Sequence, residues 1–234
     1  MISNPSFTYQ QGDTYLQLGL LSRSGVFHFF GTRHLASAGG IPGEPKGVIR
    51  AHQVHGDRLL HVVDDRDMSG VSADGLITDR PDRMLSVSTA DCVPVLIVDP
   101  VKRVIAAIHA GWRGTALNIS GKAVHTMVQS YGCAPQNLVV GIGPSIGPCC
   151  YVVGEEVWSP IQKGYGAGAL RKKPDGQVML DLPALNFCQL EAAAVPSHQI
   201  AASALCTACR PDLFSSFRRD KTLGNNMTSG IVLK

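Results

Sequence analysis

The sequence lacks any apolar run long enough to cross a membrane. No such run in the 234 residues approaches the roughly 20 apolar residues that a transmembrane helix requires. The segment Met1–Ser6 has neither the basic stretch nor the apolar core of a secretory signal. We therefore expect a protein of the cytoplasm with no membrane partner.

Charge of one sign is also scarce. The chain has 21 basic and 18 acidic side chains, a net charge of +3, which is too small to indicate a nucleic-acid partner. Only Arg171–Lys173 and Arg218–Arg219 form dense basic runs, and we predict that the first is a solvated loop. With 44% hydrophobic and 17% charged residues, the composition is that of a globular protein.

The sequence shows no internal repeat, coiled-coil heptad, low-complexity tract or change of composition that would mark a linker. One mixed α+β domain over residues 1–234 is therefore the simplest prediction. The stretch Ala38–Pro45, rich in glycine and proline, is expected to form a surface loop. The apolar periodicity predicts strands over 15–21, 26–31, 47–54, 58–64, 84–89, 94–98, 103–109, 137–142, 200–205 and 228–233, and helices over 116–131, 154–163 and 183–194.

Cysteine is present but does not form a small-domain disulfide framework. The seven cysteines are an odd set, so most are expected to be reduced thiols. Cys206 and Cys209 have the CxxC spacing of a zinc or redox pair. One such pair without a second is weak evidence for a metal site, and ordinary thiols are the favoured interpretation.

One thiol and two imidazoles lie at the predicted ends of apolar strands. Cys92 interrupts the apolar run 85–97, His109 ends the run that begins at Val104, and His55 lies upstream in His52–Gly56. Each residue type also has a structural interpretation, because free cysteines pack well in cores and histidines bond backbone carbonyls. Three such ligands can instead close three corners of a tetrahedral zinc site and leave the fourth open for catalysis.

Several motifs occur together in an order that resembles a known family. They are Gln53–Gly56, Ala73–Thr78, Thr89–Val95 (TADCVPV), Ala107–Gly114 (AIHAGWRG), Gly141–Pro148, Asp181–Asn186, Cys206–Thr207 and Phe217–Asp220. From about Phe27 onward the chain resembles the laccase-domain, or polyphenol oxidase, family of purine nucleoside phosphorylases, also called peptidoglycan editing factors. The resemblance implies mixed sheets sandwiched between helices, in a layered α/β/β/α arrangement. It also implies a zinc enzyme with His55, Cys92 and His109 as ligands.

The activities implied by the resemblance are phosphorolysis of adenosine, inosine, guanosine or methylthioadenosine, and deamination of adenosine. Deamination needs a carboxylate to move protons, and we predict Asp91 for this role, with Asp74 second. Cys92 and His109 complete the predicted catalytic set. Phosphorolysis needs cations and backbone N–H groups around phosphate. Arg33, Arg113 and the glycine-rich loop that contains Gly143 are the candidates.

The chain departs from the family pattern at three places. The segment between Ala38 and Arg50 is short, Val152 follows Tyr151 where the family often has Glu, and 224–226 reads Gly-Asn-Asn where a Gly-Arg pair is common. In the family pattern the first position contributes a wall of the pocket, the second an acidic group and the third a basic contact to the ligand.

Three other functions stay open. A single copper at the His/Cys site would give a phenol oxidase, although the chain has no His-x-His segment of the kind that multicopper oxidases use. Cys92 with His109 as base would give a metal-free Cys-His hydrolase. A non-enzymatic binding protein predicts no turnover of any nucleoside. The oligomeric state is not predicted.

Overall fold

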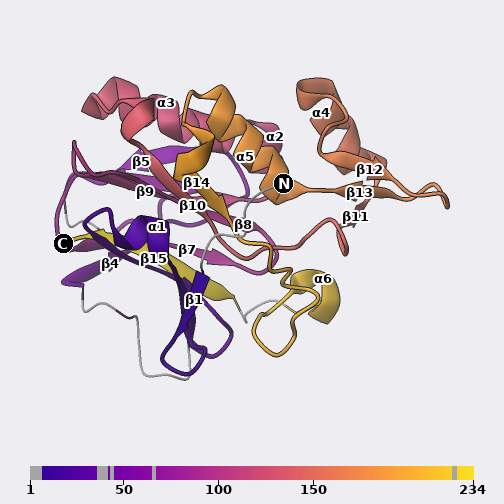
Figure 1. Cartoon of the computed structure of the whole chain (residues 1–234), viewed down its shortest axis with the longest axis horizontal. Helices are drawn as coiled ribbons and strands as arrows, with labels where there is room; N and C mark the ends of the chain where they lie inside the picture. The colour runs from indigo at the N-terminus through magenta and orange to yellow at the C-terminus, as the bar shows by residue number, and fades with distance from the viewer. Residues whose placement is uncertain (1–6, 36–41, 43–44, 65–66, 223–225) are drawn as a thin grey trace.

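Two six-stranded sheets packed face to face form the centre of the part of the chain that the structure describes (Figure 1). The structure is a computed structural model and describes residues 7–35, 42, 45–64, 67–222 and 226–234. Most of the predicted loop Ala38–Pro45 and residues Gly224 and Asn225 lie outside these residues. Among the described residues, no helix is both long and apolar enough to span a membrane.

The first sheet has the strand order β1-β2-β3-β15-β7-β4. Its pairs are antiparallel except for the parallel pair β4–β7. The strands are β1 (Phe7–Gln10), β2 (Tyr15–Leu18), β3 (Val26–Gly31), β4 (Gly47–Ile49), β7 (Arg83–Thr89) and β15 (Met227–Leu233). Strand β15 is the last strand in sequence order, yet it lies between β3 and β7 in this sheet. The C-terminal segment therefore pairs with two strands that come much earlier in the chain.

The second sheet has the order β14-β10-β8-β9-β6-β5 and is also mixed. Its two outer pairs are parallel and the inner pairs antiparallel. The strands are β5 (Leu59–His61), β6 (Gly75–Thr78), β8 (Val93–Asp99), β9 (Val104–Ala110), β10 (Val139–Ile142) and β14 (Ile200–Ala202). A small antiparallel sheet stands apart at the side (Figure 1) and contains β11 (Val152–Val153), β12 (Leu170–Lys172) and β13 (Val178–Leu180).

Helices cover the outer face of the second sheet. They are α2 (Trp112–Ala116), α3 (Ile119–Tyr131) and α5 (Leu182–Ala192), and the remaining helices are α1 (Gly19–Ser22), α4 (Glu155–Tyr165) and α6 (Phe217–Asp220). The strands β8 and β9 are buried along their whole length, because helices cover one face and the first sheet covers the other. This double burial explains their continuous apolar sequence and gives the loops at their ends a rigid base.

The predicted α+β class with mixed sheets is confirmed. Helices α4 and α5 lie within two residues of their predicted bounds. Asp181 caps α5 by accepting a hydrogen bond from the Ala184 amide at 3.1 Å. The prediction of one helix over 116–131 is wrong at its start, because Asn118 adopts a left-handed conformation (φ 63°) that separates α2 from α3.

Other bounds also differ from the prediction. The strand predicted over 15–21 ends at Leu18, where the chain turns into α1, and the strands predicted over 47–54 and 58–64 are shorter. The short strands β1, β6, β11, β12 and β13 were not predicted. Each has four residues or fewer, too few for an alternating pattern to stand out.

Candidate metal centre and substrate pocket

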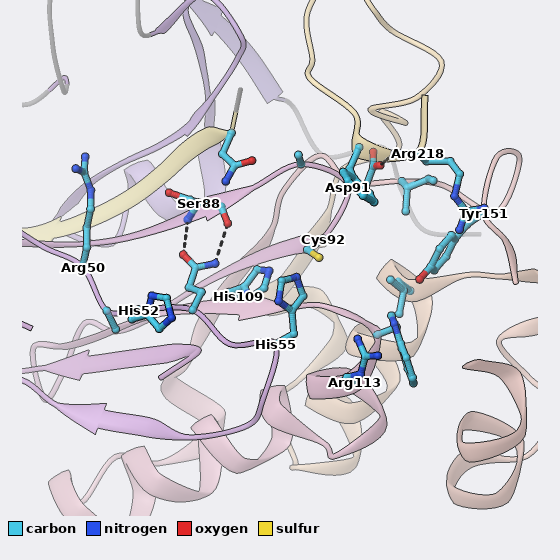
Figure 2. Close-up of a pocket in the computed structure, with 18 of the residues that line it drawn as sticks. Arg50, His52, His55, Ser88, Asp91, Cys92, His109, Arg113, Tyr151 and Arg218 are labelled. Carbon is cyan, nitrogen blue, oxygen red and sulfur yellow. Dashed lines mark hydrogen bonds between the residues drawn. The ribbon is translucent and has the colours of Figure 1, made fainter. Parts of the chain in front are cut away.

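The structure brings together the three side chains predicted to bind a metal. His55 lies before β5, Cys92 directly precedes β8, and His109 is near the end of β9. The start of β8 pairs with the end of β9, so the hairpin itself brings Cys92 beside His109. One ligand atom from each of the three residues lies within 4.8 Å of the others, and the sticks converge in Figure 2. This group can hold a metal ion.

Asp74 holds both histidines in place. Its Oδ1 lies 2.7 Å from His109 Nδ1 in a buried pair, which leaves Nε2 of that ring for the centre. The same carboxylate accepts hydrogen bonds from the backbone amides of His55 at 2.9 Å and Gly56 at 2.7 Å. His55 has a positive φ of 60°, and these bonds stabilise that conformation. A carboxylate behind a ligating histidine is a common support in metal sites.

Gly111 leaves the space in which the three side chains meet. A Cβ at this position would lie 3.1 Å from His55 Cδ2, 3.2 Å from Cys92 Sγ and 3.7 Å from His109 Cε1. A larger residue would therefore press on His55 and Cys92 and would touch His109. The donor set fits zinc, which accepts thiolate and imidazole together.

The electrostatics favour a thiolate. Burial raises the pKa of Cys92, but hydrogen bonds from His109 and His55 outweigh it and lower the pKa to about 7. Burial lowers the pKa of His109, but the bonds to Asp74 and Cys92 raise it to about 9. Burial likewise raises the pKa of Asp74, and the bonds from His109 and Gly56 hold it below its usual value. The metal-free protein thus has a thiolate–imidazolium pair, and a metal would take the place of the proton.

The three ligands lie in the wall of a pocket of about 940 Å³, a volume that suits a small organic ligand. One part of the lining is apolar and aromatic: Trp112, Ile146, Tyr151, Leu182 and Phe217. Another part is cationic: Arg50, Arg113, Arg218 and Lys221. Asp91 is the one carboxylate among the lining residues. The pocket therefore combines flat apolar surfaces with an excess of positive charge, which suits a ligand that has a ring and an anionic group.

Tyr151 and Arg218 form one edge of the pocket (Figure 2). The Arg218 guanidinium lies 4.9 Å from the centre of the Tyr151 ring and donates to the Val152 carbonyl at 2.6 Å. Burial raises the pKa of Tyr151 to about 12, so its hydroxyl remains a hydrogen-bond donor near neutral pH. The Arg113 guanidinium lies 4.4 Å from the centre of the Trp112 ring.

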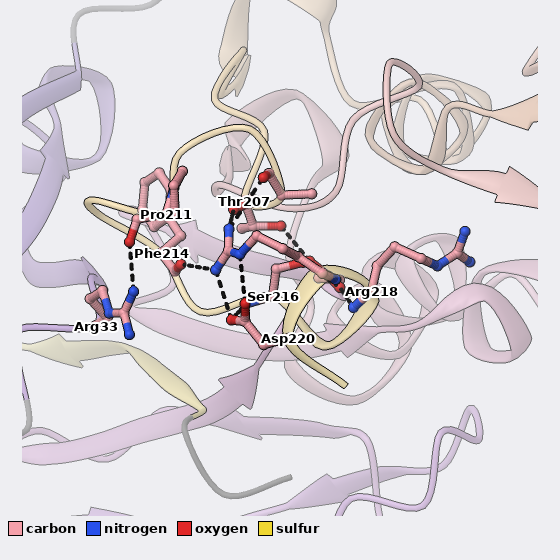
Figure 3. Close-up of polar contacts among 10 residues, drawn as sticks. Arg33, Thr207, Pro211, Phe214, Ser216, Arg218 and Asp220 are labelled. Atoms are coloured by element: carbon pink, nitrogen blue, oxygen red, sulfur yellow. Dashed lines mark hydrogen bonds and ion pairs between the residues drawn. The ribbon is translucent and has the colours of Figure 1, made fainter. Parts of the chain in front are cut away.

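Asp91 (Figure 2) holds three segments together at the pocket edge, and Figure 3 labels three of its partners, Thr207, Ser216 and Arg218. Its carboxylate accepts from Thr207 Oγ1 at 2.6 Å, Ser216 Oγ at 3.0 Å and the Arg218 amide at 2.6 Å. Its carbonyl accepts from the Ile146 amide at 2.9 Å. The carboxylate therefore has an anchoring role whatever part it takes in chemistry.

Of the predicted substrate-binding residues, the structure brings Arg113 to the pocket but not Arg33 or Gly143. Arg33 donates to the Pro211 carbonyl at 2.6 Å (Figure 3). The Gly143 amide is bonded to the Pro94 carbonyl at 2.9 Å, and a Cβ there would lie 2.2 Å from Phe30 Cδ1. Close packing, with no room for a side chain, accounts for this glycine.

Sequence reasoning missed several lining residues. Gln53 was noted only as part of a motif, yet its side chain exchanges two hydrogen bonds of 2.8 Å with the backbone of Ser88 (Figure 2), which fixes the segment that leads to His55. Arg50 and Arg218 were not among the predicted site residues, yet both line the pocket. Their positions depend on the long-range pairing of strands and loops.

Comparison with known proteins identifies the family of this chain. The model of the family described as multi-copper polyphenol oxidoreductase laccase matches residues 32–234. The chain belongs to this family. Purine nucleoside phosphorylase YlmD of Geobacillus stearothermophilus is 37% identical over 190 residues, which cover 76% of this chain and 69% of that protein.

Two further matches bear on activity and fold. Adenosine deaminase RL5, from an unknown prokaryotic organism, is 34% identical over 175 residues, covering 74% of this chain and 66% of that protein. The crystal structure of the hypothetical protein YfiH of Bacillus licheniformis superposes with a TM-score of 0.86 at 31% identity and covers 97% of this chain and 99% of that one. The fold is thus that of the family.

Proposed function

We propose that this protein is a zinc-dependent purine nucleoside phosphorylase that also deaminates adenosine. Its proposed substrates are adenosine, inosine, guanosine and methylthioadenosine, with phosphate as the second substrate. The observation that carries the proposal is the convergence of His55, Cys92 and His109 on a pocket that is aromatic and cationic. The names of the relatives, purine nucleoside phosphorylase and adenosine deaminase, support it.

The proposed metal ligands are His55, Cys92 and His109. A zinc ion held by them would supply a Lewis acid and would lower the pKa of a bound water molecule toward neutral pH. Zinc is favoured over the several coppers of a multicopper oxidase, because this is the one ligand group with histidines found among the described residues. The proposal for the remaining residues rests on their contacts in the pocket.

Phosphorolysis requires that phosphate be held while negative charge develops on the purine. We assign the phosphate to cations of the pocket lining. Arg113 is the predicted contact, and Arg218 is a second cation of the lining. The rings of Trp112 and Tyr151 offer flat surfaces against which a purine can stack. The Tyr151 hydroxyl can donate a hydrogen bond to the base as charge develops there.

Deamination requires that the leaving ammonia receive a proton. Asp91 is the proposed acid/base group because it is the one carboxylate among the lining residues. Its oxygens already accept three hydrogen bonds. Proton transfer through Asp91 would therefore use the remaining acceptor position, which lies on Oδ1.

A Cys-His hydrolase is the second candidate, favoured by the lowered pKa of Cys92 beside His109. The two candidates differ in their need for metal. Zinc-loaded protein is incubated with adenosine or inosine, with and without phosphate, and the free base, ribose 1-phosphate and ammonia are separated by chromatography. We expect base release only with phosphate, ammonia from adenosine, and loss of both in Cys92→Ala. Turnover that survives complete removal of zinc contradicts the proposal, as does the absence of any nucleoside turnover.

A further inference from the structure

Four cysteines from two distant segments meet beside the pocket, away from the proposed metal ligands. Cys149 and Cys150 follow β10, and Cys206 and Cys209 follow β14. The strands β10 and β14 pair in parallel, so their following loops lie at the same edge of the sheet. The CxxC pair that looked isolated in the sequence thus has a second pair of thiols next to it.

The distances between the sulfur atoms suit a single metal ion. All four Sγ atoms lie within 4.8 Å of one another, with Cys149–Cys209 at 3.5 Å and Cys150–Cys209 at 3.3 Å. In a tetrahedral zinc site with four thiolates, Zn–S bonds of about 2.3 Å place the sulfur atoms about 3.8 Å apart. A disulfide would use two of the four sulfurs and leave the other two unexplained.

Backbone and cationic groups surround the four thiols. The Gly147 amide donates to Cys206 Sγ at 3.2 Å, a bond that favours a thiolate. The Arg219 guanidinium donates to the carbonyls of Thr207 at 2.9 Å and Ala208 at 3.2 Å, which lie between the two cysteines of the CxxC pair. The same guanidinium is paired with the Asp220 carboxylate at 2.6 Å, so its part here is to fix the backbone between the two cysteines.

We propose that Cys149, Cys150, Cys206 and Cys209 bind one zinc ion as a closed structural site. On binding, four S–H bonds break, four Zn–S bonds form and four protons pass to the solvent, with no change of oxidation state. No ligand position is left for water. The site joins the loop that leads to Tyr151 to the segment that contains Thr207, the partner of Asp91, and so stabilises one wall of the pocket.

The test is zinc stoichiometry in protein that is purified with a non-chelating reductant, reloaded with zinc and freed of excess metal. We expect about two zinc ions per chain in the wild type and about one in either Cys92→Ala or Cys209→Ser. Cys188→Ser is the matched control, because Cys188 is an exposed cysteine outside both ligand groups, and it should keep two. One zinc in Cys209→Ser and one in the wild type would overturn the proposal, whether or not the protein turns over nucleosides.

Two further measurements guard against a variant that fails to fold. Cobalt-loaded Cys92→Ala, which has the cluster intact, should show the intense absorption of a cobalt tetrathiolate, and its absence overturns the proposal. In the wild type, denaturation under chelating conditions without reductant should expose all seven thiols to a thiol reagent. A count lower by two in each chain would show a disulfide in place of the metal site.

Discussion

The two thiol-containing regions of this protein differ in ligands and support. The His55/Cys92/His109 centre has one thiol and two imidazoles, of which Cys92 and His109 lie at the paired ends of the buried strands β8 and β9, and it faces the pocket. The four-cysteine cluster has thiols alone and lies on loops. Three ligands leave a coordination position open for chemistry, whereas four thiolates close the site. The His55/Cys92/His109 centre is therefore suited to catalysis, and the four-cysteine cluster is suited to holding two segments of the chain together.

The supports of the two regions differ in the same sense. Asp74 holds His109 by its ring and the His55 segment by its amides, so a side chain orients the ligands. In the cluster, a backbone amide, that of Gly147, contacts the sulfur of Cys206. Orientation by a carboxylate also tunes the basicity of the histidine. A structural site does not need a histidine of tuned basicity.

The largest effect on this contrast is expected from Asp74→Asn. In either orientation the new NH2 group would face a backbone N–H, that of His55 at the Oδ1 position or that of Gly56 at the Oδ2 position. The neutral amide would also bond His109 more weakly than the carboxylate does. We call the His55/Cys92/His109 group the open centre. We expect the zinc affinity of the open centre and nucleoside turnover to fall by roughly 10- to 100-fold, while the four-cysteine cluster keeps its metal. Chelator competition and steady-state kinetics measure the two quantities. Asp175→Asn, in an exposed turn, is the control, and equal zinc affinity in both variants would refute the role of Asp74.

Asp91→Asn tests the link between the two regions. The Asp91 side chain is buried and accepts three hydrogen bonds, so the change should lower the free energy of unfolding by about 2 kcal/mol. Urea denaturation measures this, with Asp212→Asn, an exposed carboxylate paired with Arg210, as control. An acid/base role would in addition change the pH profile of deamination at saturating substrate. Wild-type stability in the variant would contradict the anchoring role.

A smaller effect is expected from Gly111→Ala. The new Cβ would lie 3.1 Å from His55 Cδ2 and 3.2 Å from Cys92 Sγ, so the ligands must shift. Crowding of this kind costs on the order of 1–3 kcal/mol, and we expect zinc affinity of the open centre to fall about tenfold, since tenfold corresponds to about 1.4 kcal/mol. Gly168→Ala, where a Cβ meets nothing within 4 Å, is the control. An unchanged affinity would mean that the three side chains move freely.

The sequence predicted the open centre better than its surroundings. Cys92 and His109 could be found because each lies at the end of an apolar strand, and strand ends are fixed by periodicity. His55 was found through its motif, because the strand predicted over 47–54 ends at Ile49 in the structure. The support from Asp74, the position of Arg218 and the lack of a free amide at Gly143 depend on hydrogen-bond partners far along the chain. No local pattern contains that information.

The four-cysteine cluster shows the same limit. Cys149 and Cys209 are 60 residues apart, and only the parallel pairing of β10 with β14 brings them together. Both strands are short, and their neighbours in the sheet cannot be read from apolar spacing. The α+β class was predictable because the strands and helices of the core are regular, whereas the pairing that builds the second site was not.

The apparent affinity of the open centre for zinc should depend on pH. Because the pKa of His109 is raised to about 9 and that of Cys92 is lowered to about 7, metal-free protein between these values has a protonated His109 and a Cys92 thiolate. Zinc must then displace one proton, so its apparent affinity should rise about tenfold per pH unit over this window. Below about pH 7 the thiol must also lose its proton, and the dependence should become steeper.

Competition with a chromophoric chelator in Cys209→Ser protein measures this dependence at the open centre alone. In Asp74→Asn the bond that raises the pKa of His109 is weakened, so His109 should lose its proton at a lower pH. The apparent zinc affinity should therefore stop rising with pH at a lower pH than it does with Asp74 in place. An apparent affinity that stays constant between pH 7 and 9 would mean that His109 is already neutral in the metal-free protein. In that case Asp74 would orient the ring without holding a proton on it.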